Sequence, residues 1–142
     1  MTDEALDPVI DDLLSAIGQL VRRLRADVNP DSLTWSQTAA MALIERVGSA
    51  TIADLARAEG VKPQSMGATL AVLEQEGLVG RRPNLGDARQ VLFSLTLKGV
   101  EARQQRGLAK RAWLREAVAR LDPADQSSLA AAAALIRRLG DA

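Results

Sequence analysis

Residues 51–99 read TIADLARAEGVKPQSMGATLAVLEQEGLVGRRPNLGDARQVLFSLTLKG, and the order of elements in this stretch decides the fold. Thr51 suits the N-cap of a short helix, because its hydroxyl can accept a hydrogen bond from a free backbone N–H group, and Gly60 suits the end of that helix. Pro63 fits the first turn of a second helix, which Gly77 would end. The first half of the stretch therefore predicts two helices separated by a glycine turn.

The second half of the stretch predicts two strands with arginines near the connection. Residues 78–82 and 91–95 are rich in apolar and β-branched side chains, which favours strands. Eight residues separate the two runs, so we expect a protruding loop rather than a tight hairpin turn. Arg81 and Arg82 lead into this loop, and Arg89 stands near its far end.

A short helix, a turn, a second helix and two strands form, in this order, a winged helix-turn-helix. An α-helix fits the major groove of DNA, where each base pair presents a distinct pattern of donors and acceptors. A thin loop carrying an arginine fits the narrower minor groove, whose negative potential attracts guanidinium groups. We therefore interpret the second helix as a recognition helix and the arginine-flanked loop as a wing.

Long amphipathic helices are predicted on both sides of this arrangement. Apolar residues recur at helical spacing over residues 6–28, a helix from Thr34 to Gly48 follows, and Thr96 and Asp122 suit the N-caps of two later helices. These helices carry more apolar surface than a small DNA-binding core can cover, so we expect a two-fold homodimer. The residues expected in its interface are Leu13, Ile17, Leu114, Val118, Leu129, Ile136 and Leu139.

The predicted fold is mainly α with a small β-wing, a winged helix-turn-helix flanked by long dimerisation helices. We expect residues 1–142 to form a single domain, because this length suits one ordinary core. Within that domain, residues 34–99 would form the DNA-binding lobe. Residues 1–33 and 100–142 would form the helical dimerisation region.

The composition excludes several classes of function. The chain has no Cys and no His, which excludes Ser–His and Cys–His catalysis, zinc–thiolate sites and thiol sensing. No acid pair has a reason to be buried together and no phosphate-binding glycine loop is present, so we expect no enzyme, metal or cofactor. The apolar runs are too short for a membrane span and the acidic N-terminus lacks a signal-peptide core, so we expect a cytoplasmic protein without a membrane partner.

The formal net charge is +0, but the charge is unevenly distributed. Residues 1–34 contain seven Asp or Glu and three Arg, whereas residues 57–111 contain ten Lys or Arg and five Asp or Glu. This asymmetry indicates an anionic partner for the middle of the chain. Zero net charge also suits an alternative, a winged-helix protein–protein interaction module that does not bind DNA directly.

The quoted stretch resembles the multiple-antibiotic-resistance regulator (MarR) family of transcriptional regulators. The resemblance rests on L-E-x-x-G-L-V at the end of the second helix, D-x-R in the wing and L-T-x-x-G after the second strand, in this order and spacing. It implies a cytoplasmic homodimer that binds double-stranded DNA at a pseudo-palindromic operator. It also implies a regulator, by our expectation a repressor, of a family in which many members release DNA on binding a small organic, often aromatic, effector.

Candidate DNA-binding residues lie on the second helix and the wing. We expect Arg89 to enter the minor groove and Asp87 to orient the loop around it. Arg81 and Arg82 alternate along a strand, so we expect one of them to touch phosphate. The whole candidate set is Lys62, Pro63, Gln64, Ser65, Ala68, Thr69, Arg81, Arg82, Asp87 and Arg89.

Two departures from the family pattern affect base readout. Lys62 stands where the family often has a Ser-type cap, and Gly67-Ala68 stands where relatives often carry a polar or basic residue. Fewer side chains are then left to read bases, so we expect modest direct readout or a stronger reliance on the wing.

Two residues, Trp35 and Arg106, are candidates for effector binding, at a site expected between the DNA-binding lobe and the dimerisation helices. For Trp35 a core or interface anchor is the first interpretation, and a ligand platform is the alternative. The basic residues around Arg106 are predicted to form a solvated helix face, and contact with an anionic ligand is the alternative.

Overall fold

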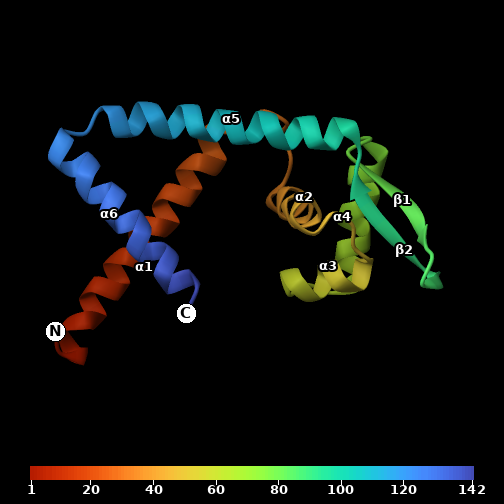
Figure 1. The fold of residues 1–142 in the computed structure, drawn as a ribbon, viewed down its shortest axis with the longest axis horizontal. Coiled ribbons are helices and arrows are strands. Elements are labelled where there is room, and N and C mark those ends of the chain that lie inside the picture. The colour runs from red at the N-terminus through yellow and green to blue at the C-terminus, as the bar shows by residue number, and fades with distance from the viewer. The chain divides into compact units, whose positions relative to one another are not determined.

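The computed structural model describes residues 1–142 as six helices and one two-stranded sheet (Figure 1). In chain order the elements are α1 (Asp3–Asp27), α2 (Trp35–Val47), α3 (Ile52–Glu59), α4 (Pro63–Gln75), β1 (Val79–Asn84), β2 (Asp87–Leu95), α5 (Leu97–Ala119) and α6 (Pro123–Gly140). The predicted fold class, mainly α with a small β-wing, is confirmed. The chain divides into two compact units: the winged-helix unit, Asn29–Gly107, and the helical unit, which combines Met1–Val28 with Leu108–Ala142.

The helix boundaries around the wing follow from local caps. The hydroxyl of Thr34 accepts from the backbone N–H of Gln37 at 3.2 Å, and the Gln37 side chain accepts from the backbone N–H of Thr34 at 3.0 Å, which completes a capping box at the start of α2. Thr51 caps α3 through its hydroxyl, which accepts from the backbone N–H three residues later at 3.1 Å. Gly60 ends α3 with φ at 67°, a left-handed conformation that favours glycine. The caps predicted from the sequence are confirmed.

The winged-helix unit has a core of aliphatic side chains around one aromatic ring. Phe93 on β2 is 2% exposed and forms two backbone hydrogen bonds with Ala50, which fastens β2 to the segment between α2 and α3. The buried side chains around it come from α2, α3, α4, β1 and the turn before β1. They are Ala40, Met41, Leu43, Ile44, Leu55, Ala56, Met66, Leu70, Leu73, Leu78 and Val79.

The wing differs from its prediction. β1 and β2 are antiparallel and extend toward each other until only Leu85 and Gly86 lie between them, so the expected eight-residue loop is wrong. Pro83 and Asp87 both have poor strand propensity. Pairing with the facing strand overrides that local preference, because a short hairpin satisfies backbone groups that a long loop would leave to water.

A bulge interrupts the pairing near the end of the wing. Pro83 pairs with Val91, and the next pair is Asn84 with Asp87, so residues 88–90 of β2 have no partner in the register. A bulge of this kind bends its strand and redirects the side chains within it. Arg89 is the middle residue of this bulge.

The junction between β2 and α5 is closely packed. The Thr96 hydroxyl accepts from the backbone N–H of Gly99 at 3.1 Å, which confirms the predicted cap, and donates to the backbone oxygen of Gly77 at 2.6 Å. A Cβ atom on Gly99 would collide with the backbone oxygen of Leu78. Glycine is therefore required at this position for the backbones to approach each other.

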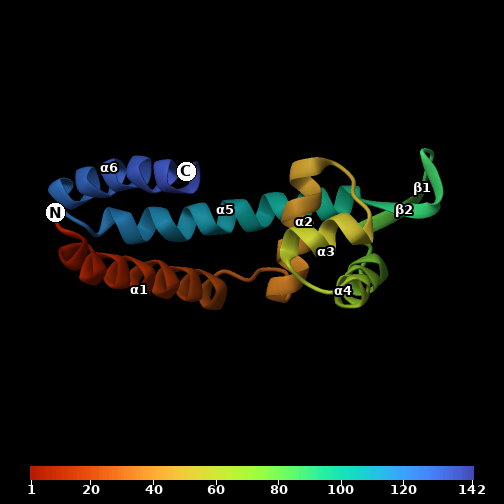
Figure 2. The same cartoon turned by 90° about the horizontal axis from the view of Figure 1, so that it is seen from below.

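The helical unit buries little of its apolar surface within one chain. α1 and α6 contain no buried residue, and Figure 2 shows α6 turning back after the end of α5. Trp113 donates its indole N–H to Asp27 at 3.2 Å, and Arg23 forms an ion pair with the same carboxylate at 2.9 Å. The large apolar residues exposed on α1 and α6 are Leu6, Val9, Ile10, Leu14, Ile17, Leu20, Leu129, Leu135, Ile136 and Leu139.

Candidate nucleic-acid interface

The side chains of α4 separate into a buried and an accessible set. Met66, Leu70 and Leu73 are buried, as the apolar spacing predicted. The candidate residues on this helix lie outside the core: Lys62, Pro63, Gln64, Ser65 and Ala68 are exposed, and Thr69 is half-buried. The buried side chains therefore fix α4 on the core, while the polar side chains of its N-terminal half remain available to a partner.

The N-terminus of α4 lacks a side-chain cap. Lys62 occupies the N-cap position and its side chain makes no capping hydrogen bond, and Pro63 follows at the first helical position. The first N–H groups of any helix have no acceptor within that helix. Here they are left to water or to an anionic partner, for which the helix dipole and the Lys62 ammonium group are both favourable.

The hydroxyl of Thr69 makes a hydrogen bond within its own helix. It donates to the backbone oxygen of Ser65 at 3.2 Å, one turn earlier on α4. While this bond is kept, the lone pairs of the Thr69 oxygen are the groups left to meet a partner. Thr69 can therefore accept from the amino group of a base, whereas the Ser65 hydroxyl is able to act as donor or acceptor.

Arg81 joins the wing to α4. Its guanidinium makes two hydrogen bonds to the Glu74 carboxylate, at 2.7 and 2.8 Å, and lies 5.4 Å from the centre of the Phe93 ring. The hydrogen bonds to Arg81 lower the pKa of Glu74 from its ordinary value, and those to Glu74 raise the pKa of Arg81. Arg81 is thus occupied by an acid of its own chain, which leaves Arg82 as the better candidate for a phosphate contact.

Arg82 is exposed on the adjacent position of β1. Its guanidinium donates to the hydroxyl of Ser49 across 3.4 Å. A bond of this length is weak, and a hydroxyl does not neutralise the charge. Arg82 therefore retains a positive charge that a phosphate group can meet.

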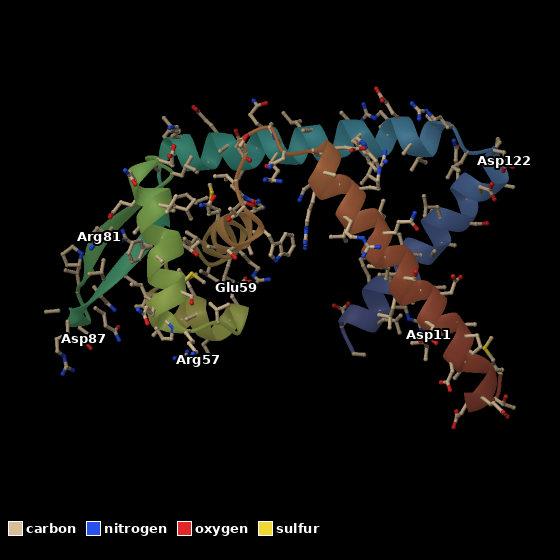
Figure 3. All side chains as sticks on the ribbon, turned by 180° about the vertical axis from the view of Figure 1, so that it is seen from behind. Asp11, Arg57, Glu59, Arg81, Asp87 and Asp122 are labelled. Carbon is tan, nitrogen blue, oxygen red and sulfur yellow. The ribbon has the colours of Figure 1, made fainter.

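Arg89 and Asp87 form the charged end of the wing. The Asp87 carboxylate accepts from the Arg89 backbone N–H at 3.0 Å and from the Arg89 Nε atom at 3.3 Å. The Arg89 side chain is nevertheless 91% exposed. Figure 3 shows Asp87 at the far end of the hairpin, with Arg81 further back along it. The Asp87 carboxylate therefore binds the backbone N–H and the Nε atom of Arg89, while the terminal nitrogens of the guanidinium remain accessible.

Arg106 does not lie on a solvated helix face, so that prediction is wrong. Its side chain is 7% exposed, and its Nη2 atom donates to Asn29, Asp31 and Thr38 at 2.9, 3.1 and 3.0 Å. Arg103, one turn earlier, is also largely buried and pairs with Glu45 at 3.6 Å. The neighbouring acid and polar groups come from segments distant in sequence, which is why spacing on the helix did not reveal them.

Trp35 lies on the wall of a small cavity in the winged-helix unit. The cavity has a volume of about 140 Å³, and the indole is 56% exposed, so Trp35 is not a core residue. Residues of α2, of α4, of the end of α3 and of the turn between α3 and α4 complete the wall. They are Ser36, Ala39, Glu59, Val61, Ser65, Met66 and Thr69.

Two residues of this surface were missed in the sequence. Glu74 lies within the quoted L-E-x-x-G-L-V motif, but no local spacing rule joins it to Arg81 across the turn that separates α4 from β1. Leu85 is fully exposed at the end of the hairpin. A single leucine among the polar residues of the predicted loop was the signal that could have identified it.

Comparison with known proteins decides the family. Residues 33–91 match the model of the MarR family. A helix-turn-helix-type transcriptional regulator from Mycobacterium tuberculosis is 37% identical over 131 residues, which cover 92% of this chain and 91% of that protein. The chain belongs to the MarR family. A helix-turn-helix-type transcriptional repressor from the same species is 33% identical to this MarR-family chain over 109 residues, 76% of this chain and 72% of that protein.

Solved structures support the same assignment. A proposed transcriptional regulator from Pseudomonas aeruginosa is 31% identical with a TM-score of 0.86, and the match covers 99% of both chains. A mutant of MarR from E. coli, in complex with operator DNA, has the same fold at 22% identity, with a TM-score of 0.67 over 98% of this chain and 99% of that one. As a MarR-family transcriptional regulator, the chain is not an enzyme. None of its helices combines the length and hydropathy needed to cross a bilayer.

Proposed function

We propose that this MarR-family regulator binds a pseudo-palindromic operator in double-stranded DNA as a homodimer. The N-terminal half of α4 enters the major groove, and the wing contacts the adjacent minor groove and phosphates. The relatives come from bacteria, in which DNA lies in the cytoplasm, so its place of action is the cytoplasm. The observation that carries the proposal is the division of α4, whose Met66, Leu70 and Leu73 are buried while Gln64 and Ser65 are exposed.

The charge of the wing supports the same proposal. Arg82 is exposed and Arg89 is 91% exposed, whereas the one acid of the wing, Asp87, is engaged by Arg89. A thin hairpin with accessible guanidinium groups suits the minor groove and the phosphates that border it. This local positive charge favours DNA over a protein partner, although the whole chain is neutral.

The helical unit supports a homodimer. α1 and α6 bury no residue within one chain and expose ten large apolar side chains between them, a surface that a soluble monomer rarely leaves uncovered. In a homodimer on DNA, the two copies of α4 would meet successive major grooves, about 34–36 Å apart.

Selection of DNA from a random-sequence duplex library by the full-length chain tests the proposal. We expect enrichment of an inverted repeat with half-sites about 10 base pairs apart. Light scattering on the same preparation reports the dimer. A folded dimer that enriches no duplex would refute direct DNA binding and favour the winged-helix protein–protein module.

We further propose that the regulator is a repressor that an organic effector releases from DNA. The relative named as a repressor supports the first part. The cavity beside Trp35 supports the second, because about 140 Å³ accommodates a single aromatic ring and Ser65 and Thr69 of α4 line it. Glu59 is the charged residue of the wall, so a neutral or cationic ring suits the cavity better than a carboxylate.

Titration of the protein–operator complex with benzyl alcohol, benzylamine and benzoate tests the effector proposal. We expect release by the first two compounds and little effect of benzoate. The Ala39→Leu variant, which fills the cavity, is expected to bind operator normally and to resist release. Equal release of both proteins would place the effector elsewhere. Transcription from a promoter that overlaps the selected operator distinguishes repression from activation.

A further inference from the structure

Leu85 is the most exposed of the large apolar residues of the chain. Its relative exposure is 101%, compared with 76% for Leu97, the next most exposed leucine. It occupies the end of the hairpin, between β1 and β2, where no side chain of its own chain covers it. An isolated surface leucine needs no explanation in general. Here, however, the leucine lies at the end of an element that the proposed function directs into DNA.

The backbone around Leu85 is fixed rather than loose. The side-chain oxygen of Asn84 accepts from the backbone N–H of Gly86 at 3.0 Å, and the side-chain nitrogen of Asn84 donates to Gln90 at 3.2 Å. Asn84 thereby binds both sides of the turn. The backbone that carries Leu85 is therefore restrained in advance, which lowers the entropy lost when a partner covers the turn.

The charges that flank Leu85 indicate the chemistry of that partner. Arg82 precedes it on β1, and Arg89 follows it in the bulge of β2 with a side chain that is 91% exposed. The partner surface must therefore combine an anionic border with an apolar interior. The DNA minor groove meets both conditions, because phosphates border it and the C–H groups of deoxyribose form its walls.

We propose that Leu85 is an apolar minor-groove contact, which inserts between the sugar walls beside Arg89 and favours A·T pairs beneath the wing. Leucine is one of the side chains that minor-groove proteins insert in this way. The exocyclic amino group of guanine protrudes into the minor groove, and A·T pairs lack it. An apolar side chain meets steric obstruction and an unsatisfied donor at G·C, and neither at A·T. This inference depends on the proposed function, since it assumes an operator.

The proposed contact of Leu85 is tested by measuring the DNA affinity of wing variants at several salt concentrations. The probe is a duplex selected by the wild-type protein. We expect Leu85→Ser to weaken binding about tenfold, the effect of losing the burial of one leucine side chain. Because no charge is removed, the slope of log affinity against log salt is expected to stay constant. Leu85→Met is expected to bind as the wild type does, and Leu97→Ser is the matched control for an exposed leucine of the same unit.

Inosine substitution tests the location. Inosine·C pairs present the minor groove of A·T and the major groove of G·C, because inosine lacks the guanine amino group. Replacing the A·T pairs beneath the wing with G·C is expected to weaken wild-type binding, and inosine·C is expected to restore it. The affinity of Leu85→Ser is expected to differ little between the duplexes with A·T, G·C and inosine·C pairs beneath the wing.

The outcomes separate this inference from the proposed function. If the wild-type chain selects no duplex, the proposed function itself fails. If the wild type binds but Leu85→Ser binds equally well, the contact does not exist. If Leu85→Ser loses affinity yet retains the full preference for A·T and inosine·C over G·C, Leu85 contacts DNA outside the minor groove and the inference is overturned.

Discussion

Arg81 on β1 holds Glu74 on α4 through two hydrogen bonds, of 2.7 and 2.8 Å. The pair spans the turn between the candidate recognition helix and the wing, and Phe93 lies beneath the guanidinium. Arg81 therefore serves to position the wing on α4, so one of the two arginines that were candidates for a phosphate contact is engaged by an acid of its own chain.

The pair predicts a specific dependence of stability on pH. The pKa of Glu74 is lowered in the folded chain, so its contribution is present above the ordinary pKa of a glutamate and is lost as pH falls through the folded value. Thermal melting at neutral pH and at about pH 3 measures this. We expect Glu74→Gln to lower the melting temperature at neutral pH and to lose less on acidification than the wild type. An identical loss in both proteins would mean that the pair contributes nothing to folding.

Removal of Arg89 is expected to affect all DNA binding in the same way. Arg89→Ala eliminates an exposed charge from the wing, so affinity is expected to fall for every duplex and the log–log salt slope to decrease by up to about one unit. Gln64→Ala is expected instead to change which operators are preferred, by roughly 1–3 kcal/mol at one base pair if Gln64 reads a base directly. Operator affinity against salt measures both, with melting temperature as the folding control. Unchanged affinity and slope for folded Arg89→Ala would show that the wing does not touch DNA.

Two glycines of α5 are expected to respond oppositely to alanine. A Cβ on Gly99 would collide with the Leu78 backbone, which has no flexible end to move, so Gly99→Ala is expected to destabilise the chain by about 1–3 kcal/mol or more. Gly107 has nothing near its missing Cβ, so Gly107→Ala is expected to stabilise it by about 0.5–1 kcal/mol. Urea unfolding measures both changes. A neutral Gly99→Ala would mean that the Leu78 backbone and α5 can move apart freely.

The buried arginine of α5 is expected to be important for stability. Arg106→Met leaves Asn29, Asp31 and Thr38 without the donor that they share, at an expected loss of about 2–4 kcal/mol. Arg57→Met is the matched control, because Arg57 is exposed on α3 and forms only a surface pair. Urea unfolding measures the difference between the two variants. Equal losses of stability would mean that the buried network of Arg106 contributes no more to folding than a surface ion pair does.

A charge on the exposed apolar face of α1 is expected to break the proposed dimer. Leu14 is 65% exposed in the single chain, and Leu14→Glu would place a carboxylate among the apolar side chains of α1 and α6. Light scattering at micromolar concentration is expected to show monomers. Ser15→Glu, the control, adds the same charge about 100° around the helix and is expected to remain dimeric. A Leu14→Glu dimer of wild-type stability would place the interface elsewhere.

The sequence by itself determined the features that depend on near neighbours. Thr34 and Thr51 begin helices because a hydroxyl can reach a backbone N–H three residues later, and Gly60 ends one because it adopts a left-handed conformation at little cost. The buried stripe of α4 follows from helical periodicity alone. These local rules, with the order of helix, turn, helix and strands, were sufficient for the fold class and for the candidate recognition helix.

Only the tertiary structure decided which charged residues are available to a partner. Arg81, Arg89 and Arg106 look alike in the sequence, yet the first pairs with an acid of α4, the second is exposed in a bulge and the third is buried among polar side chains. Arg81 and Arg89 have partners seven and two residues away, whereas the three partners of Arg106 lie 68, 75 and 77 residues away. The length of the wing was decided in the same way, because pairing between strands extended it past residues of poor strand propensity. Distant packing sets the surroundings of a charge, and those surroundings, rather than the residue type, determine whether an arginine stabilises the fold or is available to DNA.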